Sequence, residues 1–148
     1  MAAFVFNIAK GRAAHYASLP AASDGLVAVL LSTAQADATL RDHDTLAAVL
    51  AAANTEATFA GYSRKALTGV TVTVDDTGES VSVDCDDPSW SPTAAQALVR
   101  ILFCYDPATG SGTDAEIVPL VADDFALTTP TSGTVTYTVN AAGFYGAT

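Results

Sequence analysis

Two stretches of this chain are apolar on both faces of a β-strand, and they constrain the fold more than any other feature. Residues 26–32 read LVAVLLS, and residues 97–105 read ALVRILFCY, in which Arg100 is the single charged residue. A strand with apolar side chains on both faces has to be covered on both faces. The sequence therefore predicts a sheet with these two strands at its centre.

The other strand signals are shorter, and most of them alternate between apolar and polar residues. Residues 3–9 place Phe4, Phe6 and Ile8 on one face. Residues 69–83 predict a hairpin with one buried valine face and one hydroxyl face, turning at residues 75–79. Further strands are predicted at residues 57–67, 117–121 and 134–139, with a turn at Asp123 and Asp124 and a loop at Trp90. Residues 12–19 fit either a short helical turn or a loop.

One short amphipathic helix is predicted at about residues 44–53. Its apolar side chains recur at i, i+3, i+4 and i+7, and they are Leu46, Val49, Leu50 and Ala53. Asp42 and Asp44 precede them and can cap the first turn, and Asn54 suits the left-handed conformation that often ends a helix. A helix this short needs a sheet to pack on. The predicted fold is α+β and mainly β: one domain over residues 1–148, with an antiparallel or mixed sheet or sandwich.

The negative charge is confined to one half of the chain. Residues 1–74 carry five basic and five acidic side chains, whereas residues 75–148 carry eleven acidic side chains and one basic, which gives a net charge of −10. An acidic surface repels phosphate backbones and anionic lipids, so neither nucleic acid nor membrane is an expected partner. The N-terminus does not read as a signal peptide, which predicts folding in the cytoplasm with Cys85 and Cys104 reduced.

No residue pattern predicts an enzyme, a metal site or a cofactor. His43 lies between Asp42 and Asp44, but consecutive residues of a helix do not face one another, and a helix start explains all three. The string Asp84, Asp86 and Asp87 lacks the spacing of a calcium-binding loop, and Asp75, Asp76 and Glu79 are typical turn residues. The sequence contains neither G-x-S-x-G nor H-E-x-x-H.

Two other features predict contacts. Arg100 on its doubly apolar strand needs a partner, and a structural ion pair with Asp123 or Asp124 is expected. The aromatic side chains near the two termini are candidates for an interface, because aromatic residues are enriched at contact surfaces. These are Phe4, Phe6, Phe144 and Tyr145. The alternative is that they close the protein's own core.

Four segments resemble a family of small virion structural proteins from tailed phages of actinobacteria. They are FVFNIAKGR, ADATLRDHDTLAAVLAAANTEATFAGYSRKAL, LFCYDPATGSGTDAEIVPL and AAGFYGA. The resemblance implies a structural role, described in that family as capsid decoration, head fibre or minor tail component. We therefore expect a capsid accessory protein in the virion that binds the major capsid protein of the assembled head, as a homo-oligomer.

Three alternatives to capsid decoration remain open at the level of sequence. A minor tail or head-fibre protein is the first, because the same family includes those roles. A carbohydrate-binding module is the second, suggested by Trp90 with Asp86 and Asp87 nearby. An enzyme such as a cell-wall hydrolase is the third.

Overall fold

The computed structural model describes residues 3–9, 12–19 and 23–147, and a six-stranded antiparallel sheet lies at its centre. The strand order is β1-β9-β8-β2-β3, and β4 also pairs with β2. The bounds are β1 Phe4–Val5, β2 Gly25–Thr33, β3 Thr55–Glu56, β4 Lys65–Ala66, β8 Ala97–Asp106 and β9 Val118–Thr128. The predicted pair of doubly apolar strands is confirmed, because β2 and β8 are neighbours and are buried along most of their length.

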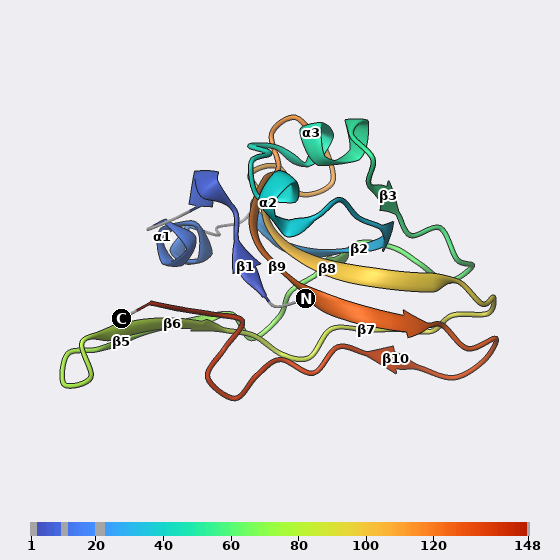
Figure 1. Ribbon diagram of the computed structural model, residues 1–148. Helices are drawn as coiled ribbons and strands as arrows, with labels where there is room; N and C mark the ends of the chain where they lie inside the picture. The colour runs from blue at the N-terminus through green and yellow to red at the C-terminus, as the bar shows by residue number, and fades with distance from the viewer. Residues whose placement is uncertain (1–2, 10–11, 20–22, 148) are drawn as a thin grey trace.

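A second layer of strands lies below the central sheet in the view of Figure 1. It consists of a three-stranded sheet, ordered β11-β6-β5, and a two-stranded one of β10 and β7. The bounds are β5 Thr71–Asp75, β6 Ser80–Asp84, β7 Ser89–Trp90, β10 Val135–Thr136 and β11 Tyr145–Ala147. The two layers are therefore arranged as a sandwich.

A continuous row of aromatic rings fills the space between the two layers. The Phe103 ring of β8 stacks on Phe144 with 4.4 Å between centroids, and it meets Tyr137 edge to face at 5.6 Å. Tyr137 in turn contacts Phe125 of β9, which faces Trp90 of β7. Aromatic pairs of this geometry stabilise a core beyond the apolar area that they bury. The row gives the two layers one shared hydrophobic core.

Short helices cover the opposite face of the central sheet. Helices α2 (Asp37–Leu40) and α3 (Leu46–Ala51) lie above it in Figure 1, whereas α1 (Ala13–Ser18) lies beside β5 and β6 and follows a 3₁₀ turn, η1 (Asn7–Ala9). Leu46 and Val49 are the buried side chains of α3. Backbone hydrogen bonds from Leu46 and Ala47 to the carbonyl oxygens of Ile117 and Asp114 hold the start of this helix.

The predicted fold class is confirmed, and the predicted helix is shorter than expected. Thr45 is its N-cap, because the Thr45 side chain accepts a hydrogen bond from the Ala48 amide at 3.2 Å. The Asp42 and Asp44 carboxylates lie outside the cap. Asn54 has no positive φ angle, and its side-chain amide instead donates to the Val49 carbonyl. The helical option for residues 12–19 is the correct one, since α1 forms there.

Several predicted strand bounds are wrong. Strand β9 runs through Asp123 and Asp124, where a turn was expected. The predicted strands at residues 3–9, 57–67 and 134–139 are each only two residues long in the structure. They are β1, β4 and β10. Trp90, placed by sequence in a loop, belongs to β7. Strand β11 was not predicted. Among the described residues, no helix has the length and apolar character needed to cross a membrane.

Candidate functional site

Arg100 lies in the middle of β8 with a side chain that is 0 % exposed. Its guanidinium group forms ion pairs with Asp37 of α2 and, across the strand pair, with Asp124 of β9 at 3.2 Å between Nη1 and Oδ1. A buried cation needs such partners to offset the loss of its hydration. The structure thus places Asp124 where it was predicted, and it adds Asp37 from the other half of the chain.

The four aromatic side chains predicted as an interface lie in or against the protein's own core. Phe4, Phe6 and Tyr145 are buried, and Phe144 is half-buried under Phe103. The Phe4 ring also lies 5.2 Å from the Arg100 guanidinium carbon and 5.1 Å from that of Arg41, which is a cation–π distance. Core packing, the alternative that the sequence left open, accounts for the positions of these side chains.

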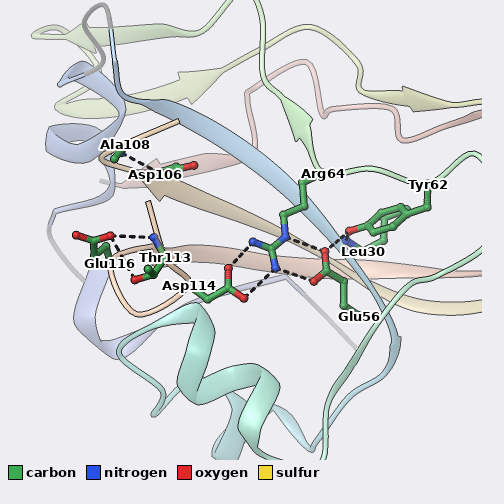
Figure 2. Close-up of polar contacts among 9 residues, drawn as sticks. All are labelled: Leu30, Glu56, Tyr62, Arg64, Asp106, Ala108, Thr113, Asp114 and Glu116. Atoms are coloured by element: carbon green, nitrogen blue, oxygen red, sulfur yellow. Dashed lines mark hydrogen bonds and ion pairs between the residues drawn. The ribbon is translucent and has the colours of Figure 1, made fainter. Parts of the chain in front are cut away.

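A second arginine, Arg64, holds a cluster that the sequence did not predict (Figure 2). Arg64 Nε and Nη2 donate to Glu56 at 2.8 and 2.7 Å, and Nη1 donates to Asp114 at 2.5 Å. The Tyr62 hydroxyl donates to Glu56 at 2.8 Å and accepts from the Leu30 amide at 3.1 Å. One guanidinium group therefore joins the segment after α3 to the loop before β9.

The ionisation of this cluster follows from its contacts. The hydrogen bonds that Arg64 donates to Glu56 and Asp114 raise the pKa of Arg64, and the same contact lowers the pKa of Asp114. Burial raises the pKa of the Tyr62 hydroxyl. Glu56, Arg64 and Asp114 are thus bound to one another as a charged cluster, and Tyr62 remains a neutral donor. These contacts make the cluster a cross-link between the Glu56 segment and the Asp114 loop.

The three residues at the predicted helix start point to different partners. His43 Nε2 lies 2.8 Å from the Gln35 side-chain oxygen, and Asp42 accepts a hydrogen bond from Asn7 at 2.5 Å. Asp44 is exposed. They do not converge on a common point, and the cap that the sequence offered to Asp42 or Asp44 is provided by Thr45.

The acidic strings accept hydrogen bonds from the protein's own chain, both within the hairpin turn and from segments distant in sequence. Asp75 accepts from the amides of Thr77 and Gly78 in the hairpin turn, and Asp87 accepts from the Val139 amide. Asp86 accepts from the Thr68 hydroxyl. Within residues 3–9, 12–19 and 23–147, no group of three or more His, Cys, Asp or Glu side chains is arranged to hold a metal ion.

Neither cysteine has the surroundings of a reactive thiol. Cys85 and Cys104 are both buried and unpaired with each other. Burial, with the nearby Asp84 as a smaller contribution, raises the pKa of Cys85 to about 12, and burial also raises the pKa of Cys104. Thiol chemistry requires the thiolate, which these values disfavour.

Trp90 is not available to a ligand. Its side chain is 1 % exposed, and its ring nitrogen donates to the Ser63 carbonyl at 2.8 Å. A carbohydrate-binding surface needs an exposed aromatic ring, so the feature that suggested a carbohydrate-binding module belongs to the core.

One hollow of the surface lies where the central sheet meets the small sheet. A hollow of 590 Å³ lies between α1, β2, β4 and β5, and the polar side chains that line it are those of Ser18, Asp24 and Thr109. Asp24 accepts a hydrogen bond from the Tyr105 hydroxyl at 2.7 Å. This hollow is lined mainly by small and apolar residues, and it offers no base paired with a nucleophile.

The predicted valine face of the β5–β6 hairpin is buried at one end and exposed at the other. Val83 is buried, Val72 and Val81 are half-buried, and Val74 is 68 % exposed. Val74 and Leu19 are the large hydrophobic side chains that the described part of the chain exposes. The prediction of a fully buried face is therefore wrong at the tip of the hairpin.

Comparison with protein-family models, with curated proteins and with solved structures gives no match to this chain.

Proposed function

We propose that this chain is a capsid accessory protein of a tailed phage, which binds the assembled head lattice and decorates or stabilises it. The observation that carries the proposal is that both buried or half-buried arginine clusters connect separate elements of the fold. Arg100 joins α2, β8 and β9, and Arg64 joins the Glu56 segment to the Asp114 loop. Both clusters connect elements of the fold to one another, as expected of a structural protein. The resemblance of four sequence segments to virion proteins supports the same role.

The proposed partner is the major capsid protein, and the proposed assembly is a homo-oligomer in the virion. Subunits that decorate a symmetric lattice commonly assemble with closed symmetry. An acidic surface also limits non-specific association before assembly.

Quantitative mass spectrometry of purified virions, with imaging of the particle, tests the proposal. We expect hundreds of copies per virion and density on the outside of the head. A few copies located on the tail would instead identify a minor tail protein. Absence from the virion, or turnover of peptidoglycan by the purified protein, would contradict a role in head decoration.

A further inference from the structure

The apolar face of the three-stranded β11-β6-β5 sheet extends beyond the part of the protein that packs against it. The register places Val72, Val83 and Tyr145 side by side in an inner row on the β5-β6-β11 sheet. It places Val74, Val81 and Ala147 side by side in an outer row. Side chains two residues apart on a strand project from the same face, so the two rows belong to one continuous surface.

The inner row is covered by the rest of the protein. Val72 lines the hollow that it shares with α1 and β2, and Tyr145 lines a hollow of 180 Å³ with Phe4 and Val121. Val83 is fully buried. The outer row lies further along the hairpin, whose turn extends past α1 in Figure 1. There the same face forms an open hollow of 400 Å³, and Val74 is 68 % exposed.

The charges around the outer row define what can cover it. Asp75, Asp76 and Glu79 line the same hollow as Val74 and Val81, and none of the described residues that line it is basic. Between Lys65 and Arg100 the sequence has six acidic residues and no Lys or Arg. A second copy packed hairpin to hairpin would bring these carboxylates together, and each copy carries a net charge of −10. Like charges across an interface disfavour it.

We infer that the outer valine row, defined as Val74, Val81 and Ala147, is a docking surface for a basic protein surface of the head lattice. The partner places apolar side chains on this row and lysine or arginine side chains against Asp75, Asp76 and Glu79. The inference rests on the proposed function and names the surface that performs it. It replaces the terminal aromatic residues as the contact surface, because those aromatics lie in or against the core.

Two substitutions of equal size on one strand test the apolar contact. Val74→Thr replaces a methyl group by a hydroxyl on the docking surface, whereas Thr73→Val makes the reverse change on the opposite, exposed face of β5. Co-sedimentation uses the purified protein and heads from the encoding phage with the gene for this chain deleted. We expect Val74→Thr to weaken binding about tenfold and Thr73→Val to leave it within about twofold. Both variants should unfold at the wild-type urea concentration, because both side chains are exposed.

The charge contribution is tested with Asp76→Asn combined with Glu79→Gln, which spares the Asp75 contacts of the turn. Binding of the wild type should weaken as NaCl is raised from about 50 to 500 mM, and that of the double variant should be weaker and less dependent on salt. Equal binding by Val74→Thr and Thr73→Val would overturn the inference and leave head binding intact. Failure of the wild type to bind heads would contradict the proposed function as well. A change of oligomeric state caused by Val74→Thr, without a change in head binding, would identify a second copy as the occupant and overturn the basic partner.

Discussion

At the scale of single residues, we expect substitution of Arg100 to reduce stability strongly, because its side chain places a full charge inside the central sheet. Removing one partner of a buried ion pair costs roughly 3–5 kcal/mol. We expect Arg100→Ala to lower the free energy of unfolding by about that amount, measured by urea denaturation. Arg100→Met should also destabilise the protein, because Asp37 and Asp124 then lose their common cation.

Arg41 provides the matched control for this prediction. Its guanidinium group also lies over the Phe4 ring, but its side chain is half-buried and donates from Nε to the Asp37 carbonyl. Exposed or partly exposed contacts of this kind are worth about 1 kcal/mol or less. A loss from Arg41→Ala as large as that from Arg100→Ala, or an Arg100→Met variant at least as stable as the wild type, would show that the buried ion pairs contribute little.

The Arg64 cluster predicts a pH dependence through Asp114. Arg64 lowers the pKa of Asp114 below its ordinary value of 3.8 in the folded state. The folded state thus binds this proton less readily than the unfolded state, so the pair stabilises the protein above about pH 4 and loses that effect as the pH falls through the lowered pKa. Asp114→Asn should lower stability at pH 7 by under about 1 kcal/mol, since solvent screens this partly exposed pair, and the difference should shrink towards pH 3.

Melting temperatures of wild type and Asp114→Asn from pH 7 to pH 3 measure this effect. Asp76→Asn is the control, because Asp76 is exposed in the turn of the β5–β6 hairpin, whereas the ion pairs of Arg64 are with Glu56 and Asp114. A gap between wild type and Asp114→Asn that stays constant with pH would exclude Asp114 as the titrating group.

At the scale of elements, the start of α3 offers a choice between two N-cap residues, Thr45 and Asp44. The Thr45 side chain caps the helix, whereas the exposed Asp44 does not. Replacing a threonine N-cap by alanine costs typically about 1 kcal/mol. We expect Thr45→Ala to lower the free energy of unfolding by that amount, Thr45→Ser to restore most of it and Asp44→Ala to change it little. The reverse order in chemical denaturation would assign the cap to Asp44, one of the two aspartates that the sequence offered for it.

Strand β9 shows why local sequence mispredicts some elements. Asp123 and Asp124 together resemble a turn, yet consecutive residues of a strand point to opposite faces. Asp124 therefore reaches Arg100, while Asp123 accepts a hydrogen bond from the Tyr137 hydroxyl in the other layer. Both carboxylates have a partner that lies far away in the sequence. Period and apolar content sufficed to predict β2, β8 and the hairpin, because those signals are local.

The same reasoning explains which contacts of the candidate sites were predictable. Asp124 could be inferred as a partner, because a buried Arg100 needs an ion pair and Asp123 and Asp124 are acidic residues of the same half of the chain. The contacts of Arg64 with Glu56 and Asp114 and the contact of Arg100 with Asp37 depend on how the helices and loops lie over the sheet. A polar residue in a loop gives no local sign of its partner. Valine and hydroxyl residues alternate in the same way at both ends of the β5–β6 hairpin. Which end is covered depends on how far the rest of the protein extends along the hairpin, and the local sequence does not show this.

At the scale of the whole molecule, the aromatic row between the layers determines whether the chain unfolds as one unit. Trp90 is the single tryptophan and reports on the lower layer, whereas far-UV circular dichroism reports mainly on the long strands of the central sheet. Because Phe103 is fully buried and contacts Tyr137 and Phe144, the two layers share one core. We expect the two signals to give the same urea midpoint, as in a cooperative transition of a single domain.

The variant Phe103→Ala extends this test to the row itself. It should lower the free energy of unfolding by about 3–5 kcal/mol, and it should move both transitions together, because both layers lose the same contacts. Val74→Thr, on the exposed outer row, should move neither. Fluorescence that changes at a lower urea concentration than circular dichroism would mean that the lower layer separates first. In that case docking of the lower layer on the head lattice would carry a cost of ordering.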